Sequence, residues 1–170
     1  SITHLFAFFY ETVYNHSNMN VYYPLEILAS FFAVVVVLTL HEFSHAFVAY
    51  RCGDPTPKWQ RRLTLNPLRH FDLVGLLCFT LVGFGWAKPV SIEPNNFKNY
   101  RVGLALTASA GIVMNYLCAW LFCPLYLVVF HYGNVMPAFL QVFLETLTFS
   151  LFAYSLSFCV FNLLPFYPLD

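Results

Sequence analysis

Three long apolar stretches, separated by polar segments, dominate the pattern of this chain. The first runs from Tyr23 to Tyr50, the second from Val102 to Phe130, and the third from Ala138 to Phe161. A helix needs roughly 20 predominantly apolar residues to cross the hydrocarbon core of a bilayer, and each stretch is longer than that. The pattern therefore predicts an all-α membrane protein with three core transmembrane helices.

The ends of the first and third predicted helices carry stop signals. Gly53 is placed to cap the first helix, and Pro55 prevents its continuation. The third helix is expected to break over Asn162, Pro165 and Pro168. Irregular backbone at membrane depth is tolerated only where protein or water satisfies its polar groups. The end of the third helix is thus expected to face other parts of the protein.

The remaining segments are too short or too polar to span. Residues 1–20 are aromatic and mildly polar, which predicts an interfacial segment or a partial span. Residues 51–101 form a loop in which the 15 residues from Phe71 to Gly85 are apolar but interrupted by Asp72 and glycines. That length favours a re-entrant segment over a crossing, and Pro89 to Asn99 is expected to be extended or turn-like. We see no internal repeat or second domain, so residues 1–170 are predicted to form a single membrane-embedded core.

Composition and charge agree with a membrane protein. Of the 170 residues, 59% are hydrophobic and only 9% are charged, whereas soluble domains carry about 25% charged residues. All eight Lys and Arg residues lie between Arg51 and Arg101. By the positive-inside tendency this loop is cytoplasmic, in a multi-pass protein whose partner is the lipid bilayer. The basic residues lack the density of a nucleic-acid surface, so no nucleic-acid partner is expected, and nothing in the pattern fixes an oligomeric state.

One polar pattern inside the first apolar stretch carries chemistry, His41-Glu42-Phe43-Ser44-His45. Histidines at positions i and i+4 project from the same face of a helix, so both imidazoles can bind one Zn²⁺ ion. The intervening Glu42 is placed to act as general base toward a metal-activated water. Ionisable residues within a membrane helix are costly and usually functional. The alternative is a polar cluster that only packs helices, but such a cluster has no need of this spacing.

A catalytic zinc site needs a third protein ligand and an open position. By the predicted topology His4, His16 and His131 lie on the outer side, and His70 lies in the cytoplasmic loop. The first and third helices both approach the cytoplasmic side, where Asp170 follows the end of the third. From the residues alone, Asp170 is as consistent with a loop acid at the membrane edge as with a third zinc ligand.

Together these motifs resemble the site-two protease family of intramembrane zinc metalloproteases, in its small prokaryotic form. That family pairs H-E-x-x-H with a later N-x-x-P-x-x-P-L-D-G, and this chain has Asn162 to Asp170 in the same pattern. Between the two motifs, Gly53 to Pro57, Arg62 to Pro67 and Gly85 to Val90 are similar to stretches of the small prokaryotic members. The resemblance covers nearly all of residues 25–170.

The resemblance implies a fold, a cofactor and an activity. His41, His45 and Asp170 are implied to hold one zinc ion per chain, and Glu42 is implied to be the catalytic acid/base. The implied function is that of an endopeptidase of the prokaryotic cell membrane, which cuts a transmembrane protein substrate near the cytoplasmic face. The family's glycine after the final Asp is missing here, so we expect the sequence to be a core fragment that is truncated at its C-terminus.

Two asparagines and a loop are implied to receive substrate. Members often carry A-G-P-x-x-N on the second core helix, and Ala110 to Asn115 matches it except that Ile112 replaces the proline. Asn115 and Asn162 are therefore candidates to bind the substrate backbone or the developing oxyanion, and the alternative is that they pin helices together. Residues 71–99 resemble the membrane-associated loop through which the family receives substrate. Its extended part could pair with an unwound substrate strand.

Two rival functions remain from the sequence. The same polar residues could form the site of a metal or proton transporter, although transporters usually show paired repeats that are not visible here. The chain could also be an inactive structural relative that keeps the fold. The intact His41, Glu42, His45 and Asp170 argue against the second rival.

Overall fold

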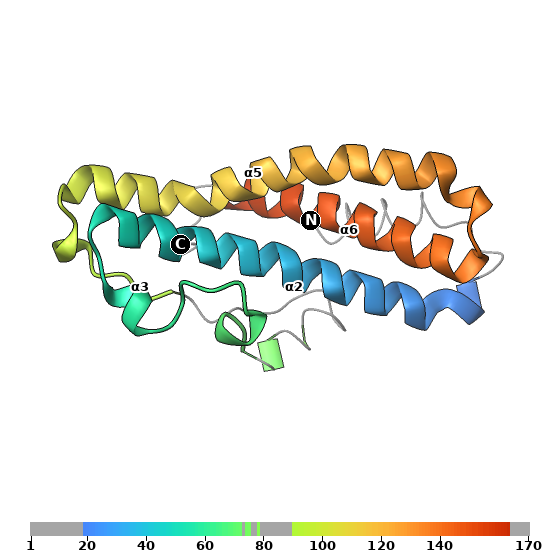
Figure 1. The fold of residues 1–170 in the computed structure, drawn as a ribbon, viewed down its shortest axis with the longest axis horizontal. Helices are drawn as coiled ribbons and strands as arrows, with labels where there is room; N and C mark the ends of the chain where they lie inside the picture. Colours follow the sequence, from blue (N-terminus) through green and yellow to red (C-terminus); the bar gives the residue numbers. More distant parts are fainter. Residues whose placement is uncertain (1–18, 73, 76–77, 79–89, 164–170) are drawn as a thin grey trace.

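Three long helices make up most of the protein, of which a computed structural model describes residues 19–72, 74–75, 78 and 90–163. Helix α2 spans Met19–Cys52, α5 spans Tyr100–Tyr132, and α6 spans Ala138–Leu163. They run side by side along the long axis of the molecule (Figure 1), and each packs against the other two. All three are long and apolar enough to cross a membrane. The predicted all-α architecture with three core helices is thereby confirmed.

The helices are longer than their apolar stretches. Helix α2 begins at Met19, within the segment predicted as interfacial, and continues through Pro24. Helix α6 includes Asn162, where the predicted break was to begin, and is described as far as Leu163. The rest of that break, at Pro165 and Pro168, lies outside the described residues. A proline restricts the residue immediately before it, so Pro165 does not require the helix to end as early as Asn162. Helix α5 runs without interruption through Ile112, the position at which members of the site-two protease family often have proline.

The end of α2 forms a Schellman motif at the predicted glycine cap. Gly53 has φ of +119°, and its N–H donates to the carbonyl of Tyr50 at 3.2 Å while the Asp54 N–H donates to that of Ala49 at 3.0 Å. The left-handed conformation favours glycine because a Cβ is strained there. A Cβ at Gly53 would also meet the Asn96 carbonyl oxygen at 2.9 Å. The chain thus turns sharply at the end of α2 and allows the segment before α5 to approach it.

Asp54 ties that segment to the end of α2. Its fully buried carboxylate accepts hydrogen bonds from the Thr56 N–H and hydroxyl, the Glu93 N–H at 2.8 Å and the Asn96 side chain at 3.0 Å. Burial raises the pKa of Asp54, but these hydrogen bonds to the charged form outweigh it and leave the pKa below its ordinary value. The loop that joins α2 to α5 is therefore anchored at both of its ends.

Short helices punctuate this loop and the opposite turn. The loop contains α3 (Thr56–Trp59), η1 (Pro67–Arg69) and η2 (Pro94–Asn96), and η3 (Gly133–Val135) joins α5 to α6. Residues 90–93, part of the segment predicted to be extended or turn-like, are irregular, and η2 forms the turn that follows. Most of the segment predicted to be re-entrant, Phe71 to Gly85, and residues 1–18 lie outside the described residues, so those two expectations stay predictions.

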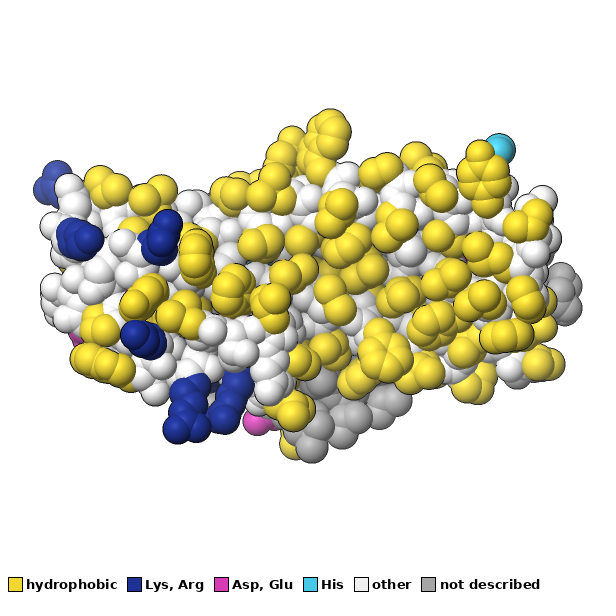
Figure 2. Space-filling view, viewed as in Figure 1, with side chains coloured by type: hydrophobic (Ala, Val, Ile, Leu, Met, Phe, Trp, Pro, Cys, Tyr) yellow, Lys and Arg dark blue, Asp and Glu magenta, His cyan; other side chains and the backbone are white. Residues whose placement is uncertain are grey.

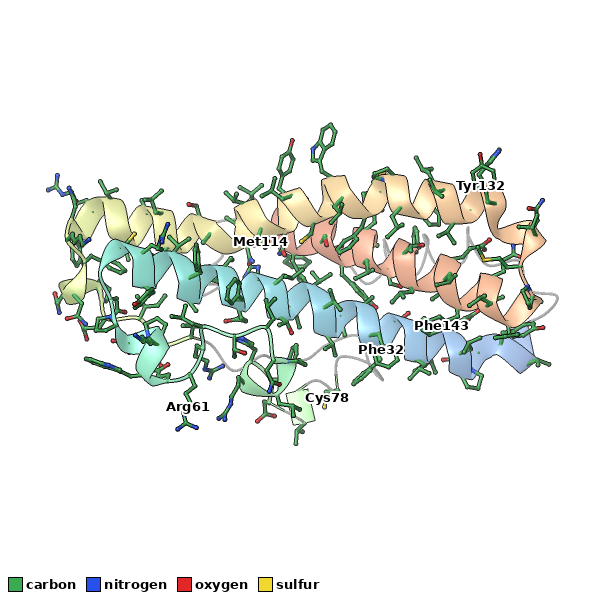
Figure 3. All side chains as sticks on the ribbon, viewed as in Figure 1. Phe32, Arg61, Cys78, Met114, Tyr132 and Phe143 are labelled. Carbon is green, nitrogen blue, oxygen red and sulfur yellow. The ribbon has the colours of Figure 1, made fainter. Side chains whose placement is uncertain are left out.

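Positive charge is concentrated at one end of the molecule. Hydrophobic side chains cover most of the face shown in Figure 2, whereas Lys and Arg side chains gather at the end that carries α3. Arg61 projects outward in this region and Tyr132 lies at the opposite end of the bundle (Figure 3). This asymmetry is what the positive-inside tendency predicts for a cytoplasmic end. The orientation itself remains a prediction.

Candidate metal centre

A single buried stripe runs along α2 and contains both histidines of the H-E-x-x-H sequence. Positions four residues apart lie on one face of a helix, and every fourth residue of this face is almost fully buried. The members of the stripe are Ala29, Ala33, Val37, His41, His45 and Ala49. The small apolar members let the helices approach closely. The packing that builds the bundle therefore also turns both imidazoles inward.

His45 is oriented by the backbone of α5. Its Nδ1 lies 2.8 Å from the carbonyl oxygen of Thr107. A carbonyl can only accept a hydrogen bond, so Nδ1 carries the proton and donates it. In the neutral ring Nε2 then carries the lone pair and can accept a hydrogen bond or bind a metal. Metal-binding histidines are usually held in this way, with one ring nitrogen donating to a carbonyl or carboxylate while the other faces the metal.

His41 is held between two asparagines. Its Nδ1 lies 2.9 Å from Nδ2 of Asn115 on α5, and its Nε2 lies 3.5 Å from Nδ2 of Asn162 on α6. Asn115 is fully buried and Asn162 is partly buried. The two asparagines therefore contact opposite sides of the same ring, and the structure brings both predicted residues together with the histidine pair.

Gly111 permits the close approach of α5 to both rings. A Cβ at this position would lie 2.3 Å from Cε1 of His41 and 2.5 Å from Nε2 of His45. Contacts that short do not occur between non-bonded atoms, which touch at about 3.5–4.0 Å. Thr107, Gly111 and Asn115 are spaced by four residues and so share one face of α5. That face supplies a carbonyl, an open space and an amide to the two imidazoles.

The two histidines fit a metal centre. Their Nε2 atoms lie 3.1 Å apart, and the ring planes meet at 72°. Two nitrogens bound to one tetrahedral zinc at 2.0–2.1 Å would be separated by roughly 3.3 Å, which is close to the observed distance. In the part of the chain that the structure describes, no group of three or more His, Cys, Asp or Glu side chains forms a ligand set. The predicted third ligand, Asp170, lies outside that part.

Glu42 lies beside a cavity next to the histidines. The cavity has a volume of about 210 Å³, and its polar lining residues are Glu42, His45 and Thr107. Val90 and Ile92, from the irregular segment ahead of η2, line it on the loop side. The carboxylate needed as a general base, one imidazole of the pair and an irregular stretch of backbone thus border one apolar space.

The loop brings a buried arginine toward Glu42. The guanidinium of Arg62 donates to the backbone carbonyl of Arg69, and its side chain is almost fully buried. Burial lowers the pKa of Arg62, while the negative charge of Glu42 raises it. The positive charge of the loop therefore acts on the carboxylate of the H-E-x-x-H sequence.

His70 supports the same part of the loop. It is fully buried, and its Nε2 donates to the Thr64 carbonyl at 2.8 Å. Burial lowers the pKa of His70, and the charge of Arg62 lowers it further, against the opposing effect of the Thr64 hydrogen bond. A neutral His70 is consistent with a structural role in the loop that carries Arg62.

The sequence identified some of these residues and missed others. It selected His41, Glu42, His45, Asn115 and Asn162, which the structure places in one region, although no observation here tests their roles. It did not assign Thr107 or Arg62 to the site, and Gly111 entered only as part of the motif from Ala110 to Asn115. The four-residue spacing of Thr107 and Gly111 from Asn115 was the signal that could have identified the contact face of α5.

The fold and the site define a class, a protein whose described part holds three helices able to span a membrane and an H-E-x-x-H pair in its core. Over 150 residues the chain is 38% identical to a protein of Bacillus subtilis (strain 168) named "Putative zinc metalloprotease YwhC". The match covers 88% of this chain and 68% of that protein. The chain therefore belongs to the same metalloprotease family as YwhC. No family model matches the chain, and no solved structure matches it.

Proposed function

We propose that the protein is a zinc endopeptidase that hydrolyses a peptide bond in or near a transmembrane segment of a membrane-protein substrate. The single observation that carries this proposal is the buried histidine pair, whose Nε2 atoms lie 3.1 Å apart inside a bundle able to span a membrane. The name of its relative YwhC supports the metalloprotease activity. The resemblance to the site-two proteases supports the location of the cleavage.

Three residues are proposed to hold the zinc ion. His41 and His45 would bind it through Nε2, and Asp170 would be the third ligand, which leaves one position for water. When bound, zinc would lower the pKa of that water toward neutrality and polarise the substrate carbonyl. At 1.5 Å rise per residue, His45 lies about 10 Å along α2 from Cys52 at its basic end. The proposed site thus lies on the cytoplasmic side of the bilayer centre.

Glu42 is proposed to move the proton. It lies next to His41 in the chain and borders the same cavity as His45, so it can accept a proton from the attacking water and pass it to the leaving amine. The loop residue Arg62 lies close enough to Glu42 for their opposite charges to interact.

The cavity and Asn162 are proposed to receive the substrate. Helical peptide bonds are protected by i to i−4 hydrogen bonds, so a substrate helix must open before its backbone is cut. The irregular residues 90–93 border the cavity and could pair with the opened strand. The Asn162 amide, 3.5 Å from Nε2 of His41, lies where it can donate to a substrate oxygen beside the metal.

Replacement of Glu42 tests the proposal. In Glu42→Gln the shape of the side chain is kept and the base is lost, so zinc binding should persist while proteolysis falls by about 10²–10⁴-fold. The assay would co-express wild type or Glu42→Gln with a panel of single-span membrane proteins and detect cleaved fragments. Cleavage by Glu42→Gln at the wild-type rate, with zinc still bound, would refute the mechanism. Zinc transport into liposomes without any proteolysis would instead favour the transporter.

A further inference from the structure

The hydrogen bonds around the histidine pair form a directional chain. The Nδ1–H of His45 donates to Thr107 O, so the neutral ring of His45 offers Nε2 as an acceptor. The facing Nε2 of His41, 3.1 Å away, can then donate to it. The Asn162 amide, whose Nδ2 lies 3.5 Å from the same nitrogen, then faces it with its oxygen, because a protonated ring nitrogen cannot accept a hydrogen bond. A neutral His41 that is protonated at Nε2 carries its acceptor lone pair at Nδ1. The Asn115 Nδ2 group lies 2.9 Å from that nitrogen and can donate to it.

A hydrogen on His41 Nε2 occupies the direction in which a metal would bind. Zinc requires a lone pair on Nε2 of both rings. His45 already meets this requirement. In neutral His41 the proton must move to Nδ1, which then needs an acceptor in place of the Asn115 NH₂ group.

Asn115 can supply that acceptor by a half-turn of its amide about the Cβ–Cγ bond. Its Oδ1 is buried without a hydrogen-bond partner within the described structure. The half-turn exchanges Oδ1 and Nδ2, so Oδ1 would face His41 Nδ1 and accept its proton. One end of the amide lacks a partner in either orientation, so the exchange does not change the number of hydrogen bonds that the amide makes to His41.

We infer that Asn115 is a positioning residue that selects the metal-binding tautomer of His41 by presenting its amide oxygen to Nδ1 when zinc binds. The inference rests on the proposed zinc site. It assigns Asn115 a hydrogen bond to the proposed zinc ligand His41 instead of a contact with the substrate. Its full burial and its contact with Nδ1, on the other side of the ring from Nε2, carry the inference. The Asn115 amide can donate a hydrogen bond to His41 Nδ1 or accept one from it, so it can pair with either tautomer of the ring. An apolar side chain of that size can do neither, and a side chain that only donates can pair with one tautomer alone.

Two variants separate this role from packing. Asn115→Asp keeps the size and the acceptor, whereas Asn115→Leu keeps the approximate volume and removes both hydrogen-bonding functions. Zinc affinity would be measured on the purified detergent-solubilised protein by competition with a chelator. We expect Asn115→Leu to bind zinc about 10–100-fold more weakly than wild type, as is typical when the partner of a ligating histidine is lost. We expect Asn115→Asp to remain within about threefold of wild type or to bind more tightly.

A matched control and a second measurement complete the test. Ser155→Ala removes another fully buried polar group, one that is bonded only within its own helix, and should leave zinc affinity unchanged. Independently of any variant, ¹⁵N NMR of histidine-labelled wild type should show His41 protonated at Nδ1 when zinc is bound.

Three results would overturn the inference. They are an unchanged affinity in Asn115→Leu, an equal loss in Asn115→Leu and Asn115→Asp, and an unprotonated His41 Nδ1 in the zinc-bound protein. Failure of the wild type itself to bind zinc would be a different result, because it would overturn the proposed function together with the inference.

Discussion

Replacement of Gly111 by alanine tests whether α5 and the histidine pair are fitted as the structure indicates. The added Cβ would lie 2.3 Å from His41 Cε1, 2.5 Å from His45 Nε2 and 2.6 Å from His41 Nε2. Since carbon and nitrogen atoms normally touch at about 3.5 Å, each contact is short by roughly 1 Å. Metal–ligand distances tolerate about 0.2 Å, so a displacement of that size removes at least one histidine from a common metal. We expect zinc affinity to fall by at least about 100-fold.

The stability of Gly111→Ala should change much less than its zinc affinity. Alanine gains about 1 kcal/mol over glycine in a helix, and overpacking costs about 1–3 kcal/mol, so the net loss is about 0–2 kcal/mol. Chelator competition would report the affinity, and thermal unfolding of the metal-free protein would report the stability. The matched control is Gly103→Ala, also on α5, whose Cβ would meet Phe97 at 2.6 Å, away from the histidines. Equal zinc affinity in wild type and Gly111→Ala would refute the reasoning.

Three further predictions concern the scaffold. Asp54→Asn should destabilise the protein by about 1–3 kcal/mol in thermal unfolding at pH 7. Because the folded-state pKa of Asp54 is lowered, its contribution to stability is present above about pH 4 and is lost as the pH falls through that pKa. An equal effect of the substitution well below that pKa would contradict this. Since burial lowers the pKa of His70, the loop should lose stability as the pH falls below about 6.5. Amide exchange of residues 62–72, corrected for the intrinsic rate, should then become faster. A protection factor that does not change between pH 7.5 and 5.5 would count against this prediction. Ala33→Leu, at a fully buried contact with α6, should cost about 1–3 kcal/mol by overpacking in the same unfolding assay, and unchanged stability would show that the contact is not tight.

The architecture was predictable because bilayer thickness constrains helix length so strongly. Three apolar stretches of sufficient length led directly to α2, α5 and α6, and the glycine cap at Gly53 followed from the need for a left-handed residue. The ends were less predictable. The hydrogen-bonded helix extends beyond the apolar stretch from which it was predicted. Helix α2 therefore begins ahead of its apolar stretch, and α6 continues through Asn162.

The candidate site was predictable as far as local spacing reaches. The i, i+4 rule placed His41 and His45 on one face, but the face of α5 that meets them depends on how the two helices pack. The contact of the Thr107 carbonyl with His45 is a backbone interaction, which residue identity does not reveal. The approach of Arg62 to Glu42 depends on the course of a loop, which the sequence gives only as polar and basic.

Zinc stoichiometry of the purified protein tests the central claim most directly, because it requires no known substrate. The measurement would compare wild type with Glu42→Gln, His45→Gln and Asp170→Ala by elemental analysis after removal of loosely bound metal. The account predicts about one zinc per chain in wild type and Glu42→Gln, none in His45→Gln, and weakened or no binding in Asp170→Ala. No zinc in the wild type after reconstitution, or equal zinc in wild type and His45→Gln, would contradict it.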